Sequence, residues 1–272
     1  MTRTTVVLAP NPGIYTGPGT NSYLVGEGDE LICIDPGPDE RAHLAALLSA
    51  ATRRGGRITR ILLTHSHPDH RPLARALAEA TVATVHCFDP ALGDERGQAL
   101  GDGDSVTAGG VSLRAVHTPG HARDHLCYLD AEADELYTGD HILGGTTTVV
   151  APPDGDMTDY LKSLSRVREL RPRVIHPGHG PRLDDGVAVI DQYIAHRLER
   201  EAQVETGLGN AGDAVAPIDL VPEIYASYPR ELWPAAAKTI EAHLDRLVRE
   251  DRAQLVISDG ERRYRTNRRT GA

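Results

Sequence analysis

The chain has 272 residues, 40% of them hydrophobic and 25% charged, which is the composition of a globular protein with a substantial core. This excludes collagen, a coiled coil and wholesale disorder, and no apolar run approaches the roughly 20 residues that cross a bilayer. The formal net charge is −10, and the acidic excess lies before residue 213, because residues 213–272 hold ten basic and ten acidic side chains. An acidic body does not attract polyanions through its overall field, although a bound metal ion neutralises nearby carboxylates.

Short β-branched runs alternate with helical patterns through the first 206 residues. The patterns predict strands over 20–26, 31–35, 58–64, 82–86, 105–108, 111–117, 126–129 and 135–138. They predict helices over 40–53, 69–80, 158–170 and 186–206. Strand pairs with helices between them indicate a layered α/β protein with mixed sheets whose faces are covered by helices.

A glycine-rich stretch, residues 207–212, is expected to link this first domain (1–206) to a smaller second domain, residues 213–272. The second domain shows helical spacing over 217–227 and 233–250 and strand patterns over 254–258 and 262–265. Between those strands, Asp259-Gly260 is a strong hairpin signal. Two helices followed by a β-hairpin predict a winged-helix-like domain.

The three cysteines, Cys33, Cys87 and Cys127, lie singly inside apolar runs. Neither a disulfide framework nor a zinc site built from paired thiolates is available, so we interpret them as small core residues. The first ten residues are too short and broken for a secretory signal. We therefore expect a cytoplasmic protein without a membrane partner.

The sharpest motif is Thr64-His65-Ser66-His67-Pro68-Asp69-His70, which begins where an apolar strand ends. Loops at strand ends are where binding sites are built, and neutral imidazole and carboxylate are ligands that zinc prefers. Four such groups within six residues allow one loop to contact two adjacent ions. The motif therefore predicts a metal site.

Three single residues share this context, each placed in a loop of small residues after an apolar run: His121, Asp140 and His179. Glycine next to each of them allows the backbone to approach an ion closely. Together, in this order across residues 11–182, these motifs strongly resemble the metallo-β-lactamase superfamily of dinuclear metallohydrolases. The resemblance implies a four-layer αββα sandwich followed by the small C-terminal winged helix.

The resemblance also implies a ligand set: His65, His67 and His121 for the first metal; Asp69, His70 and His179 for the second; and Asp140 as the bridge. Asp35, after the apolar run 31–34, matches an aspartate that supports a ligand. His125 follows His121 by one turn and His141 adjoins Asp140. We expect either histidine to hydrogen-bond the substrate or to orient a ligand.

The chemistry implied is hydrolysis by a hydroxide shared between two metal ions, with Asp69 and Asp140 as the catalytic carboxylates. Asp69 could additionally relay a proton. Two Zn²⁺ ions are the expected cofactors, with manganese or iron as alternatives. No Gly-x-Ser-x-Gly elbow or P-loop suggests a competing mechanism.

Further segments resemble one branch of the superfamily, which contains a mitochondrial β-lactamase-like endoribonuclease, its bacterial relatives and fungal polyketide thioesterases. The matching segments are 11–13, 19–25, 139–147, 159–164, 177–181 and Tyr193-Ile194-Ala195-His196-Arg197. Two positions depart from the branch: Arg71-Pro72 follows His70 in place of a small-residue pair, and His141 stands where a cysteine is common. Asp140 argues against antibiotic hydrolysis, because true metallo-β-lactamases lack this aspartate.

The first functional hypothesis is hydrolysis of a small-molecule acyl ester or thioester, since such carbonyl substrates do not require a basic surface that binds a polyanion. The alternative is cleavage of single-stranded RNA, for which the run Arg262–Arg269 offers phosphate contacts. A mononuclear iron persulfide dioxygenase uses much of the same ligand set. Non-enzymatic binding by the winged helix is disfavoured because all seven ligands are present, and a homo-oligomer is compatible with the sequence.

Overall fold

The computed structural model describes residues 3–91, 97–258 and 260–267. The first of its two large sheets has its strands in chain order: β1 (Thr4–Leu8), β2 (Asn21–Val25), β3 (Glu30–Ile34), β4 (Arg57–Leu62), β5 (Thr84–Cys87) and β6 (Gln98–Ala99). The first three strands are antiparallel and the remaining pairs are parallel. The carboxyl ends of β3 and β4 therefore meet at the same edge of this sheet.

The second large sheet has the order β12-β11-β10-β9-β8-β7. Its strands are β7 (Ser105–Ala108), β8 (Val111–His117), β9 (Leu126–Asp130), β10 (Glu135–Gly139), β11 (Val174–Pro177) and β12 (Leu183–Asp184). Only β10 and β11 pair in parallel among the described strands of this sheet. This parallel pair places Asp140 and His179 just beyond two neighbouring strand ends.

The alternation of side chains along the strands produces four layers. Tyr23 and Val25 face the second sheet, whereas Leu24 between them faces helices α1 (Arg41–Arg53) and α2 (Ala74–Thr81). On the second sheet, Tyr128 faces inward and its neighbours face α3 (Met157–Glu169) and α4 (Gly186–Ala211). The predicted four-layer sandwich is confirmed.

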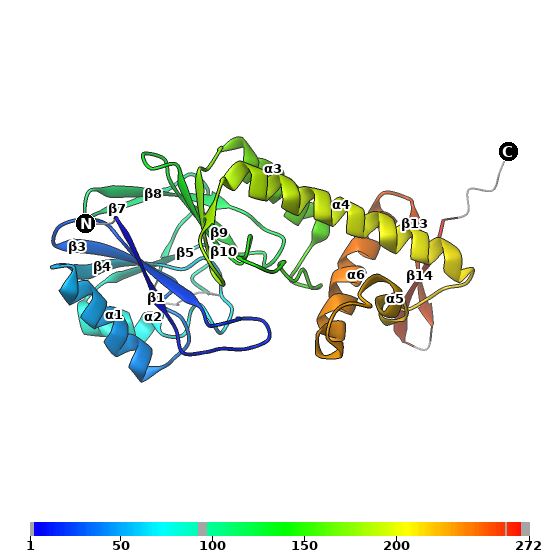
Figure 1. The fold of residues 1–272 in the computed structure, drawn as a ribbon, viewed down its shortest axis with the longest axis horizontal. Coiled ribbons are helices and arrows are strands. Elements are labelled where there is room, and N and C mark those ends of the chain that lie inside the picture. Colours follow the sequence, from blue (N-terminus) through cyan, green and yellow to red (C-terminus); the bar gives the residue numbers. More distant parts are fainter. Residues whose placement is uncertain (1–2, 92–96, 259, 268–272) are drawn as a thin grey trace.

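The C-terminal part has its own core around α5 (Pro217–Ile224), the short 3-10 helix η1 (Arg230–Leu232), α6 (Trp233–Arg249) and the hairpin β13 (Ala253–Ser258) and β14 (Glu261–Thr266). Figure 1 shows α4 running from the two-sheet part of the molecule into this C-terminal part. The winged-helix expectation is confirmed. Asp259, half of the predicted turn, lies outside the described residues, and the division into residues 1–206 and 213–272 stays a prediction.

The glycine-rich stretch 207–212 is not an extended linker, because α4 continues through it to Ala211. Leu208 is buried in the C-terminal core, and Gly207 allows Leu220 to approach the helix. Tertiary packing thus outweighs the low helix propensity of glycine. The helix ends at Gly212, whose φ of 71° is the left-handed conformation typical of a helix end.

One helix and one strand begin at least two residues later than predicted, and two strands of four or more residues were not predicted. α2 begins at Ala74 rather than at residue 69, because residues 68–72 form turns that direct Asp69 and His70 inward. β5 begins at Thr84, since Val82 adopts a left-handed conformation at the end of α2. β1 and β11 were not expected. Among the described helices, none is long and apolar enough to cross a membrane.

Candidate metal centre

The candidate site lies where strands of both sheets end. The loop with His65, His67, Asp69 and His70 follows β4, and Asp35 follows β3. The other candidate ligands follow strands of the second sheet: His121 after β8, Asp140 after β10 and His179 after β11. Residues far apart in the sequence converge because the two sheets present these strand ends to one another.

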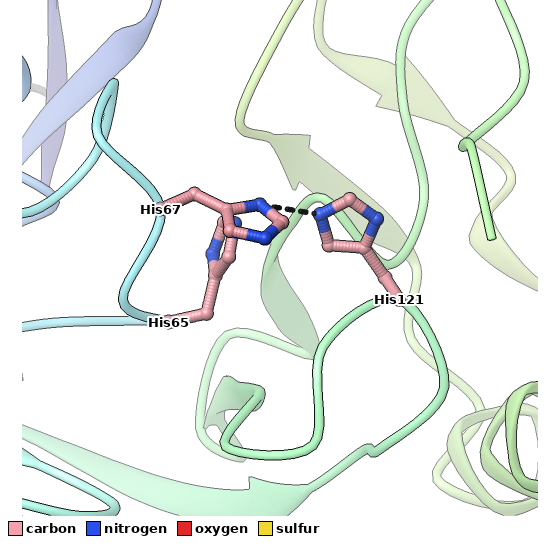
Figure 2. A group of neighbouring side chains, drawn as sticks. All are labelled: His65, His67 and His121. Carbon is pink, nitrogen blue, oxygen red and sulfur yellow. Dashed lines mark hydrogen bonds between the residues drawn. The ribbon is translucent and has the colours of Figure 1, made fainter. Parts of the chain in front are cut away.

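Three imidazoles form the first group, and one nitrogen from each of His65, His67 and His121 lies within 4.8 Å of the others. Figure 2 shows these rings converging, with 3.0 Å between Nδ1 of His67 and Nε2 of His121. His121 is oriented by its Nδ1, which donates to the carbonyl of Val149 at 2.7 Å. His65 contacts Thr64 Oγ1 through its Nδ1 at 2.9 Å. The other nitrogen of His65 is left facing the group.

Two carboxylates and two imidazoles form the second group: Asp69, His70, Asp140 and His179. Nε2 of His70 lies 3.3 Å from Oδ1 of Asp140 and 3.4 Å from Oδ2 of Asp69. Nε2 of His179 lies 3.3 Å and 3.1 Å from the same two oxygens. The second oxygen of Asp140 points the other way, to within 3.6 Å of Nε2 of His121. Asp140 therefore contacts both groups.

The carboxylate of Asp35 orients this arrangement through hydrogen bonds. Its carboxylate accepts hydrogen bonds from Thr64 N at 2.7 Å, Thr64 Oγ1 at 2.6 Å and His70 Nδ1 at 2.9 Å. His179 Nδ1 similarly donates to the carbonyl of Gly19 at 3.2 Å. In His70 and His179, Nδ1 therefore donates to a protein acceptor, which leaves Nε2 to face the carboxylates.

His125 and His141 lie outside both groups and are completely buried. His125 Nε2 accepts from the backbone N–H of Asp140 at 3.2 Å, and its Nδ1 contacts Thr118 Oγ1 at 2.9 Å. His141 packs edge-on against Tyr160, with ring centroids 5.0 Å apart. His125 is thus placed to orient Asp140, and neither histidine lines the cleft in which a substrate would bind.

Burial decides the charge of two histidines of the first group, His65 and His121. It lowers the pKa of His65 well below the ordinary histidine value and also lowers the pKa of His121. Both imidazoles are therefore neutral at physiological pH. Neutral imidazole is the form that binds metal ions.

Carboxylates decide the charge of the second group. Although burial opposes a charge on His70, Asp140 and Asp35 raise its pKa well above the ordinary value. Burial likewise opposes a charge on His179, yet hydrogen bonds to Asp140 and Asp69 raise its pKa to about 9. Two protons thus neutralise the paired carboxylates. A divalent cation can replace these protons, so the donor set fits a metal ion.

Glycine makes this close packing possible, as the sequence indicated. A Cβ on Gly178 would lie 2.7 Å from Oδ1 of Asp140 and 2.9 Å from Cε1 of His70. Gly139, with a φ of 47°, would place a Cβ 2.5 Å from Thr64 Oγ1. A side chain at Gly178 would displace the candidate ligands Asp140 and His70, and one at Gly139 would displace Thr64 and His125, which contact candidate ligands.

A cleft of about 520 Å³ opens onto the candidate ligands. One wall comes from the two-sheet part of the chain, including Tyr15 and residues between 146 and 154. The opposite wall comes from α4 and the C-terminal part: Arg197, Tyr225, Tyr228, Leu232, 234–236, Lys238 and Thr239. The ion pair between Arg249 and Asp156, at 2.5 Å, joins the C-terminal part to the two-sheet part of the chain.

The described arginines of the C-terminal run contact their own domain. Arg262 pairs with Glu241 at 3.0 Å and Asp245 at 2.5 Å, and Arg263 lies 3.6 Å from Glu261. Arg265 donates to the amide oxygen of Gln254. The remaining arginines of the run, 268 and 269, lie outside the described residues. The described members therefore stabilise the winged helix and are not arranged as a phosphate-binding surface.

Comparison with known proteins follows the same division of the chain. Residues 15–179 match the family model described as "Metallo-beta-lactamase superfamily", and residues 217–260 match "Beta-lactamase associated winged helix domain". A Drosophila melanogaster "Beta-lactamase-like protein 2 homolog" is 33% identical across 95% of this chain and 92% of its own. An "Atrochrysone carboxyl ACP thioesterase" of Aspergillus fumigatus is 33% identical across 85% of this chain and 76% of its own.

A solved structure has the same fold throughout. A metallo-beta-lactamase family protein of Thermus thermophilus superposes with a TM-score of 0.81, at 22% identity, over 97% of this chain and 98% of its own. The similarity spans both the two-sheet sandwich and the C-terminal part.

Proposed function

Because the chain belongs to the metallo-beta-lactamase superfamily and is a hydrolase, we propose that it hydrolyses a small-molecule thioester or activated ester. The observation that carries the proposal is the position of Asp140, which directs one carboxylate oxygen to each group of candidate ligands beside the cleft. Relatives named as acyl-carrier thioesterases support this choice of substrate class.

We propose that His65, His67 and His121 hold one metal ion, that Asp69, His70 and His179 hold a second, and that Asp140 is shared between them. Buried polar atoms of this set support the assignment: among the described residues Nε2 of His65 has no hydrogen-bond partner, and Nε2 of His70 and Oδ1 of Asp140 contact only other members of the set, at 3.3 Å or more. Histidine with carboxylate is the donor set of zinc, with manganese and iron as alternatives.

Bound divalent ions supply Lewis-acid chemistry: they polarise an acyl carbonyl and make water acidic enough to attack near neutral pH. The chain's own groups orient the reactants and move the proton. Asp69 lines the cleft, and its Oδ2 contacts His179, so it is placed to accept a proton from an attacking water. A thiol with a pKa of about 8.5 leaves as a thiolate without prior protonation. A thioester therefore needs no dedicated general acid.

The cleft favours a compact acyl group over a polynucleotide. Its C-terminal wall includes Tyr225, Tyr228 and Leu232, which provide apolar surface. The described arginines of the C-terminal run are paired within their own domain. Together with the acidic net charge, these contacts support a carbonyl substrate.

The test is hydrolysis of a panel of acyl N-acetylcysteamine thioesters by zinc-reconstituted protein, with release of thiol as the readout. A labelled single-stranded RNA is incubated in parallel, and the Asp140→Asn protein, purified identically, controls for contaminants. We expect the wild type alone to release thiol. Wild-type cleavage of RNA without thioester hydrolysis would contradict the proposal.

A further inference from the structure

Arg197 is a buried cation without a carboxylate partner in the described part of the chain. It lies in the middle of α4, is 1% exposed and forms part of the cleft wall. Its Nη2 donates to the carbonyl of Thr148, and its guanidinium packs over the ring of Tyr160 at 5.1 Å. Among the described residues its Nε has no hydrogen-bond partner, and no aspartate or glutamate forms an ion pair with the side chain.

Two other charged residues, one on α4 and one in the cleft wall, are paired with opposite charges within the protein. Glu201, one turn further along the helix, binds Arg246 and Arg252 from the C-terminal part. The carboxylate that could have neutralised Arg197 is therefore committed to other arginines. Lys238, which also lines the cleft, is paired with Glu241 at 2.8 Å.

A buried charge is costly unless it is paired and hydrogen-bonded. Guanidinium remains protonated, so it cannot escape this cost by losing a proton. Its planar array of donors matches the two oxygens of a carboxylate or phosphate. The incompletely bonded guanidinium of this cleft-lining residue therefore indicates an anion supplied from outside the chain.

Hydrogen bonds connect Arg197 to the backbone of the candidate metal centre. Thr148 accepts from Arg197 through its carbonyl and donates through Oγ1 to the carbonyl of Asp140 at 2.8 Å. A single residue thus connects Arg197 to the shared candidate ligand. We place the anion on the short acyl part of the substrate, because a long thiol carrier would have to leave the cleft of about 520 Å³.

We propose that Arg197 binds a carboxylate on the acyl part of the substrate and makes the enzyme specific for acidic acyl thioesters. This inference rests on the proposed function. A phosphate on the thiol part is the other source of the same chemistry, and the test below separates the two.

The experiment compares glutaryl and pentanoyl thioesters, which have the same chain length and differ in the terminal carboxylate, each on N-acetylcysteamine and on coenzyme A. The readout is the ratio of kcat/KM for the glutaryl over the pentanoyl substrate. We expect the wild type to prefer glutaryl on either thiol, and Arg197→Met to lower the ratio roughly tenfold or more. Arg197→Lys, which keeps the charge but not the planar donors, should give an intermediate ratio and serves if the methionine variant does not fold.

Arg200→Met is the matched control. Arg200 lies on the same helix, packs over Tyr225 at 4.3 Å and donates to the carbonyl of Ile224, but it does not line the cleft. This control should keep the wild-type ratio. An unchanged ratio in folded Arg197 variants would overturn the proposal, as would a preference for coenzyme A that is independent of the acyl charge.

Calorimetric binding of free glutarate to the metal-free protein separates this inference from the proposed function. If no thioester is hydrolysed, binding by the wild type and loss of binding in Arg197→Met still supports the anion site. Absence of binding by the wild type overturns it.

Discussion

The carboxylate of Asp35 and the imidazole of His70 form a hydrogen bond of 2.9 Å, and both side chains are almost completely buried. The two residues are 35 positions apart but follow β3 and β4, which are parallel neighbours. This contact uses the Nδ1 proton of His70 and turns Nε2 toward Asp140.

Replacing Asp35 by asparagine should weaken metal binding by about 10- to 100-fold, because such hydrogen-bonding partners fix the ligand's orientation and basicity. The measurement is competition for zinc with a chromophoric chelator. Asp130→Asn is the control, since Asp130 is equally buried but pairs with Arg3 far from the candidate ligands. Equal affinity in the two variants would show that Asp35 does not support the site.

Replacing Asp140 by alanine should reduce thioester hydrolysis by at least about a hundredfold, because it removes the carboxylate proposed to be shared by two ions. Asp140 is not part of the hydrophobic core, so the circular dichroism spectrum of the variant should match that of the wild type. Turnover near the wild-type rate would rule out the shared role.

Replacing Gly178 by alanine should reduce hydrolysis by about a hundredfold, since the new Cβ would displace Asp140 and His70, and small displacements of reacting groups have large effects on rate. Gly209→Ala is the control, because a Cβ there meets no atom within 4 Å and alanine favours the helix. Both variants are assayed at saturating zinc. Full activity of Gly178→Ala would show that the loop tolerates a side chain.

Glu201 should make the free energy of unfolding depend on pH. Burial opposes its charge, yet hydrogen bonds to His243 and Arg246 lower its pKa to about 2 from an ordinary value of 4.5. The carboxylate therefore stabilises the fold fully above about pH 4.5, and this contribution is lost as the pH falls toward 2.

Glu201→Gln should accordingly lower the free energy of unfolding at pH 7 by about 3 kcal/mol, with a difference from the wild type that shrinks in acid. Urea unfolding at several pH values measures it. Glu205→Gln is the control, because Glu205 pairs with Arg252 at the surface and should cost little. A difference that is constant with pH would contradict the role of the Glu201 charge.

The candidate ligands could be predicted because four of them form one compact motif after an apolar strand, three lie in loops of small residues after apolar runs, and their order resembles a known family. Arg197 could not. It lies in a helical pattern four residues before Glu201, which is typical of a solvated ion pair. Its burial depends on the C-terminal part packing against α4.

The end of α4 could not be predicted from the sequence either, because glycines 207, 209 and 212 indicate that the helix stops unless the tertiary packing is known. β11 was missed for a related reason. Pro177 argues against a strand, but it is the last residue of β11, and its carbonyl accepts from Asn21 and Tyr23. Contacts with distant residues decide both elements.

The most direct test is titration of the metal-free protein with zinc, measuring bound zinc per chain by elemental analysis together with the rate of thioester hydrolysis. We expect two zinc ions per chain, with the rate reaching its maximum when both are bound. One iron per chain with consumption of oxygen and no release of thiol would contradict metal-dependent thioester hydrolysis.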